Sequence, residues 1–337
     1  MATWAIVIAL FGMSHKDAAE PKTLVGGQAR STMWYFYALM GPAIWALLNH
    51  LDKYLLGRFF KESAAGPVLV AFTGFAAIMV ATIILLFEPS VFALAPWQAF
   101  SAMSAGALLV ASYVPYMIAM QRDEASVVAS LYRLAPLFVF VLSYTALGES
   151  LHPKQLAGGL VTISGSVLLV VDLDKGRYRL NLFTFFLMCA ACLLSACTVV
   201  IFKFIALEVS FWNSAFWQYI GVGISSISLI CSMPSYRSTL FALLRSREAY
   251  VLVPITVSGE VFNLLANLAV GFAGLMAPLA LVSIVTGLHP LFLLAYGVLF
   301  TLFFPTFGSE CLTARHVLRK VVSIGVMCAG VAITFSP

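Results

Sequence analysis

Charged residues are scarce in this sequence: they make up 10% of its 337 residues, whereas 62% are hydrophobic. Soluble domains are about half apolar and about a quarter charged, so a soluble fold of this composition would expose large apolar patches and aggregate. The formal net charge is only +5 and is spread over loops, which gives no basis for nucleic-acid binding. The composition predicts an integral membrane protein.

Cysteine is also sparse, and the usual enzyme motifs are missing. The six cysteines mostly lie in apolar stretches, and the pair Cys189-Ala-Ala-Cys192 has no second pair or nearby His to complete a metal site. We therefore interpret them as packing residues and expect no metal and no other cofactor. The sequence contains no Gly-x-Gly-Asp or His-Glu-x-x-His motif, so an enzyme is not expected.

Apolar runs of membrane-spanning length recur along the chain. About 20 apolar residues in a helix cross the hydrocarbon core, because the backbone must satisfy its own hydrogen bonds there. The runs are 34–52, 66–87, 97–119, 125–146, 154–172, 182–206, 212–232, 250–272, 277–304 and 317–335. They predict an all-α integral membrane protein with about ten transmembrane helices.

The runs divide into two halves of five. We predict a non-spanning N-terminal segment at 1–33, a first five-helix repeat at 34–172, a charged linker at 173–181 and a second repeat at 182–336. Both halves contain the pattern Leu-x-Pro-Leu-Phe in their fourth helix, around Pro136 in the first and Pro290 in the second. An odd number of helices per half forces the second copy to enter the membrane inverted, an arrangement that recurs in transporters.

Residues 125–171 carry a family resemblance. They combine a small-residue helix start, the mid-helix Pro136, a Gly148-Glu149 turn and a glycine-rich fifth helix. This resembles the EamA-type repeat of the drug/metabolite transporter superfamily. The resemblance implies a ten-helix carrier of small metabolites, often an exporter, with cytoplasmic termini. In the second half, Glu310 corresponds only loosely to Glu149 and Gly330 to Gly165.

Polar residues inside the predicted helices are the candidate substrate-binding residues. A charge at the centre of a membrane helix costs about 3 kcal/mol on insertion scales, so it pairs or faces a wet cavity. Arg133 and His289 lie in the fourth and ninth helices, and Glu260, Asn263 and Asn267 share a face of the eighth. Arg133 suits a carboxylate or phosphate, with Glu260 or His289 handling a coupling proton. The alternative is that Arg133 and Glu260 only neutralise each other, and that His289 is a hydrogen-bonded core residue.

Further candidates complete the expected site. Lys53 and Lys203 occupy similar places in the first and sixth helices, where each either faces the substrate or extends to the interface. Tyr113 is expected to line the pocket, and Pro136 and Pro290 to kink their helices. We expect a central cavity bounded by helices one, three, four, six, eight and nine, with Arg133 and Glu260 facing into it.

Together these observations predict a multi-pass secondary transporter of the plasma or inner membrane. Its expected partners are a small-molecule substrate, membrane lipid and a coupling proton, and the substrate is an amino acid or another anionic or zwitterionic solute, moved outward. Alternatives are a nucleotide-sugar or sugar-phosphate exchanger, and a channel or a non-transporting membrane protein. The orientation in the membrane stays open. Most loop cations lie on one side of the membrane, which the positive-inside rule places in the cytoplasm and the family resemblance places outside.

Overall fold

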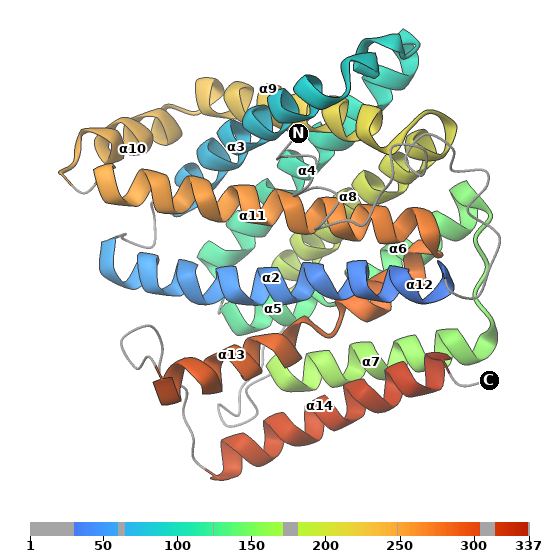
Figure 1. Cartoon of the computed structure of the whole chain (residues 1–337). Coiled ribbons are helices and arrows are strands. Elements are labelled where there is room, and N and C mark those ends of the chain that lie inside the picture. Colours follow the sequence, from blue (N-terminus) through green and yellow to red (C-terminus); the bar gives the residue numbers. More distant parts are fainter. Residues whose placement is uncertain are drawn as a thin grey trace.

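The computed structural model describes residues 30–59, 65–123, 125–170, 181–247, 249–303 and 314–335. All regular structure in these ranges is helical (Figure 1). The helices are α2 (Arg30–Phe59), α3 (Ala65–Phe87), η3 (Pro89–Ala93), α4 (Pro96–Arg122), α5 (Ala125–Tyr132), α6 (Ala135–Leu147), α7 (Pro153–Val170), α8 (Leu182–Glu208), α9 (Phe211–Ser232), α10 (Pro234–Arg245), α11 (Ala249–Met276), α12 (Leu279–Thr286), α13 (His289–Phe303) and α14 (Ala314–Phe335). Most of the expected N-terminal segment and charged linker lies outside the described residues.

Side chains are distributed as expected for a protein dissolved in lipid. Large apolar residues such as Leu86, Phe100 and Tyr250 lie exposed on the outside of the bundle, whereas Lys203 and Glu260 are buried. Within the described residues, six helical stretches are long and apolar enough to cross a membrane, namely 70–87, 96–122, 182–208, 211–232, 249–276 and 279–303. Two shorter apolar helices, Ala135–Leu147 and Val321–Phe335, accompany them. The protein is therefore a multi-pass integral membrane protein.

The helices pack in pairs drawn from both halves of the chain. Figure 1 shows α2 beside α11 and α7 beside α14, and these pairs are in contact, as are α4 with α8 and α3 with α9. Each of these pairings joins a helix before residue 172 to one after residue 181. The core is thus built between the halves, which do not form two separate bundles.

Glycine permits the closest of these approaches. A Cβ on Gly158 of α7 would lie 2.5 Å from the carbonyl oxygen of Gly330 in α14, and a Cβ on Gly165 would lie 2.8 Å from the Met327 side chain. Positions that increase along α7 therefore meet positions that decrease along α14, so these helices are antiparallel. Gly158 lies opposite Gly330 at this crossing.

Two of the predicted helices are broken, and one α-helix and the short 3₁₀ helix η3 were not predicted. The run at 125–146 forms α5 and α6, and the run at 277–304 forms α12 and α13. The short helix α10 follows α9 and has no buried residue. Its mixed sequence, with Arg237 and Arg245 among apolar residues, lacks the long apolar run on which the predictions depended.

Candidate functional site

The two helix breaks provide irregular backbone inside the membrane-spanning part of the fold. Arg133 and Leu134 form the turn between α5 and α6, and Gly287 and Leu288 form the turn between α12 and α13. Each break precedes a proline, which occupies the second position of the following helix. Proline fits the first turn of a helix because the N–H it lacks would have no partner there. The expected kinks at Pro136 and Pro290 are therefore complete interruptions.

Neighbouring side chains satisfy some of the backbone carbonyl groups at the breaks. The hydroxyl of Ser166, in α7, donates to the Gly287 oxygen at 3.2 Å. The thiol of Cys192, in α8, lies 3.8 Å from the Leu131 oxygen. Irregular backbone at membrane depth is tolerated only where it is buried in protein or lines a cavity, and both breaks meet this condition.

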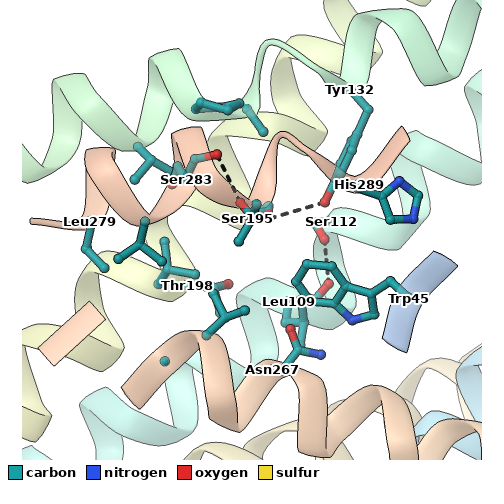
Figure 2. Close-up of a pocket in the computed structure, with 18 of the residues that line it drawn as sticks. Trp45, Leu109, Ser112, Tyr132, Ser195, Thr198, Asn267, Leu279, Ser283 and His289 are labelled. Atoms are coloured by element: carbon teal, nitrogen blue, oxygen red, sulfur yellow. Dashed lines mark hydrogen bonds between the residues drawn. The ribbon is translucent and has the colours of Figure 1, made fainter. Parts of the chain in front are cut away.

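A cavity of about 550 Å³ lies between the two breaks. It is bounded by α2, α4, α5, α6, α8, α11 and α12, which correspond to the helices expected from the sequence, and by the start of α13. Thr162 and Ser166 of α7 and Gln218 and Tyr219 of α9 also reach it, so its wall includes the fifth and seventh predicted helices as well. Figure 2 shows the side chains of Trp45, Asn267 and His289 around this space.

Arg133 is the central charged residue of the cavity wall. Its Nη2 atom donates to Nδ1 of His289 at 3.2 Å, and Nε2 of His289 lies 3.2 Å from the amide nitrogen of Asn49. This chain of contacts crosses from the α5–α6 turn through α13 to α2. It joins two residues that the sequence singled out separately, and Asn49 completes it.

Arg133 and Glu260 do not form an ion pair with each other. Among the described residues no carboxylate is bonded to Arg133, and its buried Nε atom has no hydrogen-bond partner there. Glu260 accepts hydrogen bonds from Thr73 at 2.9 Å and from Asn263 at 3.2 Å. Mutual neutralisation, which the sequence left open, does not occur in this structure, and Glu260 is not among the residues that line the cavity.

An amide network connects Glu260 to the cavity. Oδ1 of Asn263 accepts from the indole nitrogen of Trp45 at 3.0 Å and from Asn267 at 3.3 Å. Both asparagines line the cavity, as does Trp45. The i, i+3, i+7 spacing on α11 that predicted a shared face therefore produces a hydrogen-bonded strip, with Glu260 at its buried end.

Lys203 and Glu149 form a second polar cluster at the cavity wall. The ammonium group of Lys203 pairs with one oxygen of Glu149 and donates to the carbonyl of Ala277 at 2.9 Å. The other Glu149 oxygen accepts from the backbone N–H of Leu279 at 2.8 Å, at the start of α12. Gly148, with φ of 68°, ends α6 and turns the chain toward this contact. Lys203 is buried inside the protein.

The remaining candidates divide between the cavity and other places. Tyr113 and Pro136 line the cavity, whereas Pro290 is buried beside His289 and is not part of the lining. Lys53 lies in α2, and its side chain falls outside the described part of the structure. Glu310 also lies outside it.

Sequence reasoning missed several polar and aromatic lining residues. Trp45 and Ser195 line the cavity, and the Ser195 hydroxyl lies 3.4 Å from the hydroxyl of Tyr132 (Figure 2). Serine and tryptophan are common in membrane helices, so their residue types carried no signal. Only the packing of α2 and α8 around the breaks places them at the site.

Comparison with known proteins finds a family resemblance in the first half of the chain. Residues 32–171 match the EamA-like transporter family. The match covers the first half, including α2 to α7, and the family is part of the drug/metabolite transporter superfamily, whose members are membrane transporters. The resemblance seen around Pro136 and Gly148-Glu149 is thereby confirmed.

The fold of this chain is shared with a solved structure over nearly its whole length. A crystal structure of another protein aligns with a TM-score of 0.63 at 16% sequence identity, covering 92% of this chain and 97% of the other. At that identity the likeness concerns the fold alone. No curated protein sequence matches the chain.

Proposed function

We propose that this protein is a secondary transporter that carries a small organic anion by alternating access. The observation that supports this most directly is Arg133, a guanidinium in the cavity wall. Its contacts with the described residues leave Nε without a partner and include no carboxylate. A buried cation without a counter-ion is costly, and a planar guanidinium binds carboxylates and related anions through two parallel hydrogen bonds. An anionic substrate supplies the missing charge.

The cavity favours an anion over a zwitterion. No Asp or Glu is found among the residues that line it, so a substrate ammonium group has no carboxylate to bind in the described wall. Lys203 is already paired with Glu149, which leaves Arg133 as the cation available to a ligand in that wall. One available cation fits a monoanion better than a nucleotide sugar or a sugar phosphate, whose phosphate groups carry more charge.

The ten-span arrangement in two inverted repeats is part of this proposal. The contacts between helices support this arrangement. When each helix is replaced by its counterpart in the other half, the α4–α8 contact becomes the α11–α2 contact, and the α6–α8 contact becomes the α13–α2 contact. The pairs α3–α9 and α7–α14 map onto themselves. Corresponding helices that meet antiparallel are expected from an inverted repeat, and α7 and α14 meet in this way.

The cavity lies between the halves, which is where alternating access requires the substrate to bind. A channel requires a continuous polar path across the bilayer, whereas the polar groups here cluster around the two breaks. As the family resemblance implies, we place the transporter in the plasma or inner membrane and assign it export of a metabolite. The direction of net flux in a secondary transporter follows the solute gradients.

Flux in proteoliposomes tests the proposal. The purified full-length protein is screened for counterflow of monocarboxylates, sulfonates, amino acids, sugar phosphates and nucleotide sugars. We expect monoanions to be exchanged, and the variant Arg133→Leu to lose about 10- to 100-fold in transport efficiency, the value of a lost hydrogen bond to a charged group. Arg133→Lys retains the charge but lacks the planar guanidinium group, so its transport efficiency should fall between those of the wild type and Arg133→Leu.

Arg245→Leu is the matched control, because it removes a cation from the exposed end of α10, away from the cavity. It should transport like the wild type. Exchange of amino acids or sugar phosphates in place of monoanions contradicts the assigned substrate class. Flux that continues unchanged in Arg133→Leu contradicts the role of Arg133.

A further inference from the structure

The contact between Arg133 and His289 fixes the protonation state of the imidazole. Arginine has donors only, so Nδ1 of His289, 3.2 Å from the guanidinium, must accept the hydrogen bond. The neutral ring then carries its proton on Nε2. The ring also forms a hydrogen bond with the backbone of Trp45, and the side-chain amide of Asn49 lies 3.2 Å from Nε2. His289 is therefore a neutral acceptor held between a cation and an amide.

An anion bound at Arg133 reverses this situation. Its oxygen takes the guanidinium N–H that His289 was accepting, and the lone pair on Nδ1 is left facing another acceptor. Adding a proton to Nδ1 turns the imidazole into a donor toward the same anion. The negative charge also offsets the repulsion between imidazolium and guanidinium. Anion and proton therefore favour each other's binding, and this coupling is reciprocal.

We propose that His289 takes up one proton together with the anion bound by Arg133, so that a monoanion and a proton cross the membrane as an electroneutral pair. This inference rests on the proposed function. The proton comes from water on the loading side, forms an N–H bond at the Nδ1 lone pair, and returns to water on the other side when the anion leaves. The only bond formed and broken in the protein is this N–H bond.

The groups around His289 support its role as the proton acceptor. The α5–α6 turn contributes Arg133, and α4 and α5 contribute Tyr116 and Tyr132, which flank the guanidinium. From α2, His50 contacts the Leu293 carbonyl of α13 at 2.9 Å and does not line the cavity. The segment 279–286, α12, contains no ionisable residue.

The two buried carboxylates described above are engaged elsewhere. Glu149 binds Lys203 and the start of α12. Glu260 accepts hydrogen bonds from Thr73 and Asn263 and is separated from the cavity by the amide strip. Among the described lining residues, His289 is thus the one that contacts Arg133 and has a lone pair that can take up a proton.

Cotransport of a monoanion with a proton depends on the pH difference across the membrane and not on the membrane potential. A monoanion and a proton carry no net charge, so the membrane potential does no work on their transport. A pH difference of one unit supports about tenfold accumulation of the anion when one proton accompanies each anion. A metabolic acid that accumulates inside a cell would leave together with its proton.

The test uses proteoliposomes that contain the full-length protein and an internal pH dye. Benzenesulfonate is the main probe, because it stays ionised throughout the working pH range and brings no proton of its own. Benzoate is the second, with the flux into protein-free vesicles subtracted. We expect anion entry to acidify the lumen by one proton per anion. An alkaline lumen should drive about tenfold accumulation per pH unit, and a potassium–valinomycin potential of either sign should leave accumulation unchanged.

The variant His289→Gln separates coupling from structure. Its side-chain oxygen can still accept from Arg133 but cannot take up a proton. We expect slower entry without acidification, and accumulation that now follows the potential by about tenfold per about 60 mV. His50→Gln is the matched control, since His50 and His289 are each 7% exposed and bridge the same two helices. It should keep proton coupling.

The outcomes distinguish this inference from the proposed function. Anion entry without protons in the wild type, or full coupling in His289→Gln, overturns the inference and leaves anion transport intact. A rate loss in His289→Gln with unchanged coupling assigns His289 a purely structural role and also overturns it. If the wild type carries neither these probes nor any anion of the counterflow screen, the proposed function fails and this inference fails with it.

Discussion

Lys203, near the end of α8, and Glu149, in the turn after α6, form a buried ion pair that joins the two halves of the chain. Glu149 also accepts the first free N–H of α12, where the helix dipole favours a negative charge. One carboxylate therefore fixes the positions of α6, α8 and α12 at one end of the cavity.

Removing Glu149 should destabilise the protein strongly. Glu149→Leu leaves the Lys203 ammonium buried with the Ala277 carbonyl as its one remaining partner among the described residues, and a broken buried pair costs about 3–5 kcal/mol. We expect a marked fall in the midpoint of thermal unfolding in detergent. The double variant Glu149→Leu/Lys203→Met removes both charges and should recover most of the loss. A double variant as unstable as the single one would show that the cap on α12, not the charge pair, dominates.

The crossing of α7 and α14 should tolerate no side chain at Gly158. A Cβ there meets backbone atoms of Gly330 and Thr334, so Gly158→Ala forces the helices apart at a cost of about 1–3 kcal/mol. Gly325→Ala, in α14, is the control, because its Cβ meets nothing within 4 Å. This change should be neutral or stabilise the helix by up to about 1 kcal/mol. Equal unfolding midpoints for the two variants would contradict the close crossing.

Removing both Arg133 and Glu260 should not restore transport. The two residues have different partners, His289 for the first and Thr73 and Asn263 for the second. Arg133→Leu/Glu260→Leu is therefore expected to transport no better than Arg133→Leu in the counterflow assay. Transport at the wild-type rate in the double variant would show that neither charge binds substrate.

Both ends of the chain should lie on the same, cytoplasmic side of the membrane. Ten spans place the termini together, and the family resemblance favours the cytoplasm. The positive-inside rule gives the opposite orientation, but the cations that it counts include residues near the helix ends. A reporter that fluoresces only in the cytoplasm, fused after Pro337, should be active. Activity of a reporter that works only outside the cytoplasm would support the charge rule.

The positions of the long helices were predictable from the sequence because burial in lipid requires continuous apolar runs. The helix breaks were only partly predictable. Pro136 and Pro290 mark them, but a proline alone does not tell whether a helix bends or stops. The amphipathic helix α10 was missed because it is short and mixed in composition.

The candidate site was predictable where a residue is unusual in lipid. Arg133, His289 and the asparagines of α11 stood out because polar groups in a membrane helix need a partner. Their partners depend on packing between distant helices, which no local pattern contains. The contact of Arg133 with His289 joins positions 156 residues apart, and the described residues show no direct pairing of Arg133 with Glu260, the alternative that the sequence left open.

The breaks also have a mechanical consequence. The helices α5 and α12 each contain eight residues. Each is a short rigid segment that can tilt about the two residues of the turn that follows it while α6 or α13 stays in place. The hydrogen bond between Arg133 and His289 links the turn after α5 to the start of α13. A ligand that replaces this bond frees α5 and its turn from α13.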